Sequence, residues 1–173
     1  NTLGVQAVYP MTAEAVSKQI QSIGEDMGTD AVKTGMLFNA EIIKAVSEMI
    51  EYYNWKNVVV DPVMIAKGGA SLLQLEAISA LKKYLLPLAM VITPNIPEAE
   101  VLTGISIRTD EDKEEAAKYL YDLGVKHVVI KGGHDEDRDV AVDLLYDGME
   151  FKTFTSKRIP TKNTHGTGCT FSA

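Results

Sequence analysis

The chain has 173 residues, of which 46% are hydrophobic and 24% charged, and its formal net charge is −7. That length and composition are typical of one globular domain with a substantial apolar core. The acidic balance argues against a nucleic-acid-binding protein, so a positive field for any anionic ligand must be local, from a lysine, a metal ion or a helix N-terminus.

In the first half of the chain, amphipathic stretches alternate with short apolar runs. Thr12 and Asn39 are expected to cap the first two helices, because their side-chain oxygens can accept from backbone N–H groups of the first turn. The predicted helices cover residues 12–27, 39–53 and 75–85, and the predicted strands cover 31–34, 58–61 and 90–93. Glycine or proline follows each strand, and a Gly68-Gly69 loop is expected after the second.

The second half continues the alternation and then changes pattern. A helix is expected near Pro97, and a second from Thr109, whose spacing to Asp112 is that of a capping box, to about residue 123. A strand follows at 127–131. Residues 140–146 and 150–155 alternate around Asp147-Gly148, a strong hairpin signal. We therefore predict an α/β fold with a mainly parallel sheet and an antiparallel edge hairpin.

Polar, glycine and proline residues gather where the predicted strands end. Ligands of open parallel sheets bind outside the carboxyl ends of the strands. The four segments at that edge are Lys33-Thr-Gly-Met36, Asp61-Pro-Val-Met64, Thr93-Pro-Asn-Ile-Pro-Glu98 and Lys131-Gly-Gly133. The sequence thus predicts a ligand site along this edge.

The segment Thr164-His-Gly-Thr-Gly-Cys169 precedes a predicted helix. Gly166 and Gly168 let the backbone N–H groups around Thr167 turn into one concavity, which with a helix N-terminus predicts an anion hole. The alternative is a glycine-rich turn without a ligand. Cys169 is a candidate proton acceptor, because helix N-termini favour thiolates, and its alternative is a small buried apolar residue.

Three charged residues complete the candidate site. Lys131 ends a strand and can reach a phosphate, the alternative being a surface lysine. We expect Lys131 to serve the ligand and not the fold. Asp61 and Glu98 can hold Mg²⁺ through waters beside substrate phosphates, the alternatives being a turn residue and an acidic first-turn helix residue. Their joint occurrence at one edge favours the functional interpretation.

Three familiar signatures are absent from the sequence: a P-loop, a dinucleotide-binding glycine fingerprint and a nucleophile elbow. Four segments instead resemble the ribokinase superfamily, and most closely its hydroxymethylpyrimidine/phosphomethylpyrimidine kinase branch in thiamin biosynthesis. They are Asp61-Pro-Val-Met64, Thr93-Pro-Asn-Ile-Pro-Glu-Ala99, Val129-Ile-Lys-Gly-Gly-His134 and Thr161-Lys-Asn-Thr-His-Gly-Thr-Gly-Cys-Thr170. The resemblance implies a three-layer α/β/α fold.

The resemblance also implies a role for each residue. Cys169 would be the base, with Lys131 as the second catalytic residue, and Gly166, Thr167 and Gly168 would form the anion hole. Lys131, Asn95 and Thr167 would bind ATP, and Asp61 and Glu98 would lie around Mg²⁺. Met36, Val63 and Cys169 would contact the pyrimidine.

The implied reaction is ATP-dependent phosphorylation of 4-amino-5-hydroxymethyl-2-methylpyrimidine and then of its monophosphate. Pyridoxal kinase and a non-catalytic ligand-binding domain of the same fold are the alternatives. We expect a cytoplasmic protein with a small-molecule pyrimidine as its partner, no nucleic acid or membrane partner, and a homodimer as the candidate assembly. Asn1 and the incipient helix at Ala173 predict a single domain, residues 1–173, truncated at both ends.

Overall fold

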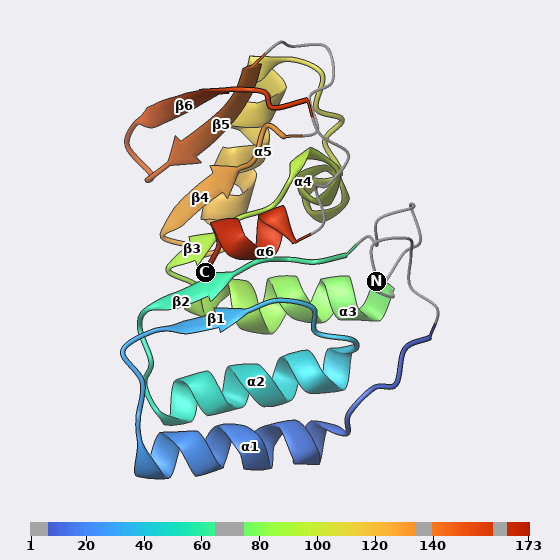
Figure 1. Cartoon of the computed structure of the whole chain (residues 1–173), viewed down its shortest axis with the longest axis vertical. Coiled ribbons are helices and arrows are strands. Elements are labelled where there is room, and N and C mark those ends of the chain that lie inside the picture. The colour runs from blue at the N-terminus through green and yellow to red at the C-terminus, as the bar shows by residue number, and fades with distance from the viewer. Residues whose placement is uncertain (1–6, 65–74, 134–139, 161–165) are drawn as a thin grey trace.

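The computed structural model describes residues 7–64, 75–133, 140–160 and 166–173, and it contains one six-stranded sheet in the order β1-β2-β3-β4-β5-β6 (Figure 1). β1 to β4 are parallel, and β5 and β6 form an antiparallel hairpin at the edge. The strands are β1 Val32–Thr34, β2 Val58–Val60, β3 Val91–Ile92, β4 His127–Ile130, β5 Val140–Tyr146 and β6 Phe151–Lys157. The predicted parallel sheet and edge hairpin are confirmed.

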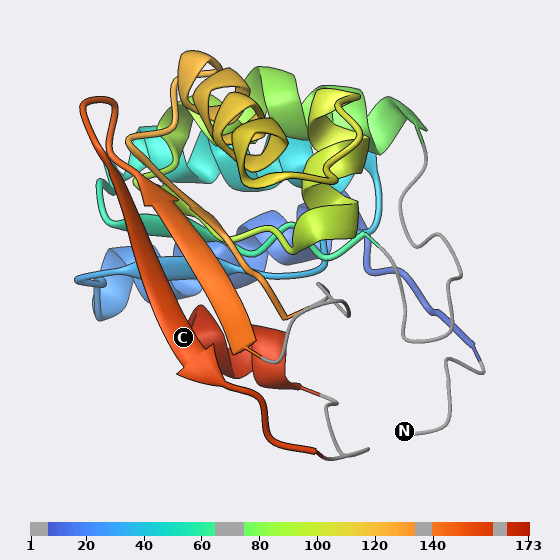
Figure 2. The same ribbon diagram turned by 90° about the horizontal axis from the view of Figure 1, so that it is seen from above.

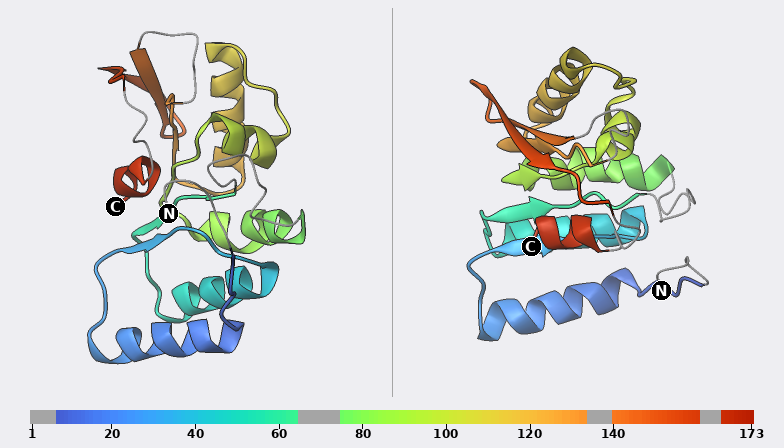
Figure 3. Two further views of the ribbon diagram at one scale, coloured as in Figure 1. Left: turned by 45° about the vertical axis from the view of Figure 1, so that its right-hand side comes forward. Right: turned by 45° about the horizontal axis from the view of Figure 1, so that its top comes forward.

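Helices cover both faces of this sheet. Figure 2 shows α2, α3, α4 and α5 on one side and the short α6 on the other. The helices are α1 Ala13–Asp26, α2 Ala40–Tyr52, α3 Leu75–Ala80, α4 Ile96–Thr103, α5 Asp110–Asp122 and α6 Thr167–Phe171. This arrangement agrees with the predicted α/β/α class. α1 packs beside α2 at the β1 end of the molecule, far from the hairpin (Figure 3).

The predicted helix caps are confirmed. Thr12 Oγ1 accepts a hydrogen bond from the Ala15 N–H at 3.1 Å, and Asn39 Oδ1 accepts one from the Ile42 N–H at 2.9 Å. At α5 the Thr109 side chain accepts from the Asp112 N–H while Asp112 accepts from the Thr109 N–H, which is a complete capping box. Local chemistry therefore fixes where these helices begin.

The stretch predicted as one helix over 75–85 is divided in the structure. α3 passes into a wider helical turn at Leu81–Leu85 and then a 3₁₀ turn at Leu86–Leu88. Pro87 lies in the last turn and has no N–H with which to continue an α-helix. The predicted Gly68-Gly69 loop, residues 134–139 and the motif residues 161–165 lie outside the described residues.

Alternation along the strands separates an apolar face from a polar edge. Val58 and Val60 of β2 and Ile130 of β4 are buried on the side covered by α2 to α5. The residues that alternate with these in each strand, and the first residue after each strand, face the opposite side of the sheet, where α6 lies. Asp61 and Lys131 lie one residue past β2 and β4, so both side chains are directed toward that face. No helix within the described ranges is long and apolar enough to span a membrane.

Candidate active site

A buried carboxylate lies between two lysines at the carboxyl edge of the sheet. Asp61 follows β2, and its side chain is only 3% exposed. Lys131, just past β4, donates a hydrogen bond from Nζ to Asp61 Oδ1 at 3.1 Å. Lys33 of β1 holds its Nζ 4.0 Å from the other oxygen, Oδ2. Two ammonium groups, one from β1 and one from the end of β4, thus compensate one carboxylate that has lost most of its hydration.

The backbone around Lys131 is held on both sides. The Lys131 N–H donates to the Pro94 carbonyl at 2.8 Å, and the Gly132 N–H donates to Asp143 Oδ1 at 2.8 Å. A Cβ on Gly132 would overlap the Val142 carbonyl, so glycine lets β5 approach this closely. With its side chain 13% exposed, Lys131 is not a surface lysine. Its ion pair with the nearly buried Asp61 gives Lys131 a partner within the fold, which the expectation of a purely ligand-serving residue did not include.

Asn95 and Glu98 form a capping box at the start of α4. Asn95 Oδ1 accepts from the Glu98 N–H and Glu98 Oε2 accepts from the Asn95 N–H, each at 2.9 Å. Burial raises the pKa of the Glu98 carboxyl, and the nearby charge of Asp61 adds to this, while the Asn95 hydrogen bond and the Lys131 charge oppose it. Glu98 is therefore the first-turn helix residue of the alternative interpretation, and it also lies within the electrostatic reach of Asp61 and Lys131.

The donors at this edge fit a hydrated Mg²⁺ ion. Within the part of the chain that the structure describes, no group of three or more His, Cys, Asp or Glu side chains could enclose a metal. Mg²⁺ usually needs only one or two carboxylates, completed by waters and substrate phosphates. Asp61 and Glu98 supply two. The buried Thr93 Oγ1, one residue past β3, has no partner among the described residues and is a further oxygen available to a water or ligand.

The short helix α6 brings the glycine-rich segment to the same edge. Gly166 caps it with φ of +81°, a left-handed conformation that glycine adopts without strain. A Cβ on Gly168 would lie 3.3 Å from Lys131 Nζ, so the missing side chain lets the ammonium group approach the helix backbone. Thr167 is the first residue of α6, and Cys169 in its first turn is exposed, not buried as the alternative interpretation requires.

Lys33 is a site residue that the sequence analysis placed at the edge without assigning it a role. Its Nζ donates to the Cys169 carbonyl oxygen at 3.0 Å, in addition to its contact with Asp61. The sequence does carry a signal for Lys33. It is the one charged residue in its predicted strand, and that strand lies next to the predicted strand that ends in Asp61. A second addition is Arg158, whose guanidinium donates to the carbonyls of Gly132 and Gly133.

Two of the three predicted pyrimidine contacts, Met36 and Val63, follow the neighbouring strands β1 and β2. Met36 lies just beyond β1 and is 40% exposed, and Val63 lies just beyond β2 and is half-buried. The Val63 N–H donates to the Asp61 carbonyl at 2.8 Å, which fixes the backbone between the carboxylate and this apolar side chain. Since β1 and β2 are adjacent and parallel, both residues lie at the same edge of the sheet as Asp61.

Fold and site together define an α/β protein in which lysines, carboxylates and a glycine-capped helix gather at the carboxyl edge of a mainly parallel sheet. Over residues 1–173 the chain matches the family model described as phosphomethylpyrimidine kinase. It is 52% identical, over its full length and 64% of the relative, to a hydroxymethylpyrimidine/phosphomethylpyrimidine kinase of Bacillus subtilis. The chain belongs to the phosphomethylpyrimidine kinase family.

Two other relatives extend the comparison. A thiamine biosynthesis bifunctional protein of Geobacter sulfurreducens is 50% identical over the whole chain, which spans 35% of that protein. The crystal structure of an ADP complex of Bacillus subtilis pyridoxal kinase superposes with a TM-score of 0.87 at 42% identity, covering 96% of this chain and 61% of that one. The chain therefore spans less than two thirds of each relative named here.

Proposed function

We propose that the protein is an ATP-dependent kinase that phosphorylates the hydroxymethyl group of 4-amino-5-hydroxymethyl-2-methylpyrimidine and then the resulting monophosphate, in thiamin diphosphate biosynthesis. The observation that carries this proposal is the position of Lys131, which contacts the buried Asp61 and lies against Gly168 of α6. A cation held between a carboxylate and a glycine-rich helix start is suited to a transferring phosphoryl group.

The protein's part in this reaction is positioning and charge compensation. Lys131 would contact the ATP phosphates as a point charge, held in place by Asp61. The N–H groups around Gly166, Thr167 and Gly168 would receive the negative charge that spreads over the phosphoryl oxygens in the transition state. Asn95, whose backbone pairs with Lys131, would lie beside the nucleotide.

Asp61 and Glu98 would hold Mg²⁺ through waters. Bound there, Mg²⁺ would supply positive charge against the charge that develops on the phosphoryl group. Asp61 is already shared between two lysines, and Glu98 is anchored by the Asn95 capping box. Both carboxylates are thereby fixed in orientation before any ligand arrives, which reduces the reorganisation that binding requires.

Cys169 would accept the proton of the attacking hydroxyl group. It is exposed in the first turn of α6, next to the glycine-rich segment, where the hydroxymethyl oxygen must approach the phosphoryl group. Met36 and Val63 would contact the pyrimidine ring from the ends of β1 and β2. The transfer then moves the phosphoryl group from ATP to the substrate oxygen and leaves ADP, with the hydroxyl proton on the thiolate.

Pyridoxal is the second candidate substrate, because the chain superposes on a pyridoxal kinase at 42% identity. It also carries a hydroxymethyl group on an aromatic nitrogen ring, so the same base and anion hole would serve it. The test is ATP consumption by the natural protein with hydroxymethylpyrimidine, its monophosphate and pyridoxal measured side by side. We expect the highest kcat/KM values for the two pyrimidines, and a preference for pyridoxal would reverse the assignment.

A further inference from the structure

We propose that Lys33 is the residue that lets this site accept a phosphorylated substrate, by pairing its ammonium group with the phosphate of the pyrimidine monophosphate. The proposal rests on the proposed function, since it concerns the second of the two phosphorylations. It starts from the hydrogen bond that Lys33 Nζ donates to the Cys169 carbonyl oxygen at 3.0 Å.

The charges at the sheet edge leave Lys33 less neutralised than Lys131. Asp61 is the carboxylate between them, and its close ion pair, at 3.1 Å, is with Lys131. Lys33 lies 4.0 Å from the second oxygen, and its side chain is 29% exposed against 13% for Lys131. Glu98 also interacts electrostatically with Asp61 and Lys131. The positive charge of Lys33 is thus only partly neutralised by Asp61, and it is accessible to solvent.

The chemistry of the two steps places the first phosphate next to this lysine. In the first step the hydroxymethyl oxygen must lie at Cys169, which takes its proton. The phosphate formed is attached to that same oxygen. In the second step it must lie between the ring and the γ-phosphate of ATP, again beside Cys169. Lys33 Nζ is within hydrogen-bonding distance of that residue's backbone, so an anion there would meet a cation.

The neutral substrate needs no such partner, whereas a phosphomonoester carries a charge of about −1.5 to −2 at neutral pH. A hydrogen bond from an ammonium group to a phosphate oxygen is charge-assisted and strong.

The position of Lys33 in β1, three residues before Met36, also places it on the pyrimidine side of the site. Lys131 reaches the site from β4, on the nucleotide side. Lys131 would therefore bind the phosphates of ATP, and Lys33 would bind the phosphate of the pyrimidine monophosphate.

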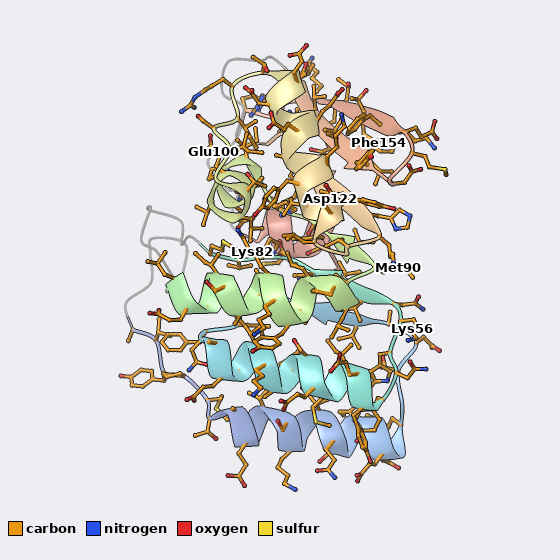
Figure 4. All side chains as sticks on the ribbon, turned by 180° about the vertical axis from the view of Figure 1, so that it is seen from behind. Lys56, Lys82, Met90, Glu100, Asp122 and Phe154 are labelled. Atoms are coloured by element: carbon orange, nitrogen blue, oxygen red, sulfur yellow. The ribbon has the colours of Figure 1, made fainter. Side chains whose placement is uncertain are left out.

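The test compares the affinities of the natural protein for hydroxymethylpyrimidine and for its monophosphate by isothermal titration calorimetry without ATP. The variants are Lys33→Met, which removes the charge but keeps the length, and Lys33→Arg, which keeps the charge. Lys56→Met is the matched control, because Lys56 is an exposed lysine before the amino end of β2, labelled in Figure 4.

We expect Lys33→Met to weaken monophosphate binding about 10- to 100-fold, the usual effect of losing a hydrogen bond to a charged group. Binding of hydroxymethylpyrimidine should change less than about threefold, Lys33→Arg should restore most of the monophosphate affinity, and Lys56→Met should change neither. Equal weakening of both ligands would show that Lys33 only holds α6 and would overturn the proposal, as would no weakening of either. Failure of the unmodified protein to transfer phosphate from ATP would contradict the proposed function instead, and the binding comparison would still decide the role of Lys33.

Discussion

Lys33 Nζ donates a hydrogen bond to the carbonyl oxygen of Cys169 at 3.0 Å, across 136 residues of sequence. This bond joins β1 to α6, a helix of five residues that is too short to be stable alone. Inside α6, the Thr170 N–H donates to the Gly166 carbonyl and the Ser172 hydroxyl to the Gly168 carbonyl. The position of the candidate base therefore depends on contacts from the sheet as well as on the helix itself.

The Asp61–Lys131 pair should be strongly coupled in stability. Removing one partner leaves the other as an uncompensated charge in a nearly buried position, so Asp61→Asn or Lys131→Met should each cost roughly 3 kcal/mol of unfolding free energy. The double variant should lose clearly less than the sum of the two. Chemical denaturation of the four proteins gives the coupling energy. Additive losses would mean that the pair is not an interacting unit.

Gly132 and Gly133 should differ sharply when a methyl group is added. Gly132→Ala puts a Cβ against the Val142 carbonyl and should lower the unfolding free energy by about 1–3 kcal/mol, as overpacking usually does. Gly133→Ala meets nothing within 4 Å and serves as the control, with a change close to zero. The comparison is made by thermal unfolding. A tolerated Gly132→Ala would contradict the close approach of β5.

Glu98→Gln should change both stability and metal requirement. The Glu98 pKa is raised above its ordinary value of 4.5, chiefly by burial, so the folded state binds this proton more tightly than the unfolded state. Its contribution to stability therefore falls as pH rises above about 4.5. Glutamine keeps an acceptor for the Asn95 N–H without the charge.

The stability of Glu98→Gln relative to the unmodified protein should thus improve between pH 4.5 and 7, measured as the difference in Tm across that range. If Glu98 also holds Mg²⁺, the concentration of Mg²⁺ for half-maximal rate should rise in the variant. A Tm difference that is the same at every pH would argue against the buried charge. A lower rate at unchanged Mg²⁺ dependence would remove Glu98 from the metal site.

Cys169→Ser tests the candidate base. Serine is close in size but a poor proton acceptor near neutral pH, so kcat should fall by roughly 10²–10⁴, the usual range for general-base catalysis. The affinity for ATP should change little, because the N–H groups of α6 remain. Since Cys169 is exposed, the Tm should stay nearly constant and serves as the folding control. A kcat within a few-fold of normal would show that the proton goes elsewhere.

Much of the fold and site followed from local sequence chemistry. Cap residues such as Thr109 and the Asp147-Gly148 turn act over a few residues, so their patterns located helix starts and the hairpin. The strand ends likewise placed Asp61 and Lys131 at one edge, because parallel strands align their carboxyl ends.

What the sequence could not show depends on contacts between distant segments. The choice of Lys131 over Lys33 as the close partner of Asp61 is set by distances of 3.1 and 4.0 Å between side chains from three strands. The separate roles of Gly132 and Gly133 depend on where the Val142 carbonyl lies in β5. Neither relation leaves a periodic pattern in the sequence. The assignment of Lys33 required the position of Cys169, 136 residues away.

The most direct test of the proposed function is a ³¹P nuclear magnetic resonance time course of the natural protein with hydroxymethylpyrimidine and excess ATP and Mg²⁺. We expect a phosphomonoester signal to rise first and then to be replaced by the two coupled signals of a diphosphate ester, as the γ-phosphate signal of ATP declines. No phosphorylated pyrimidine under conditions in which pyridoxal is phosphorylated would contradict it.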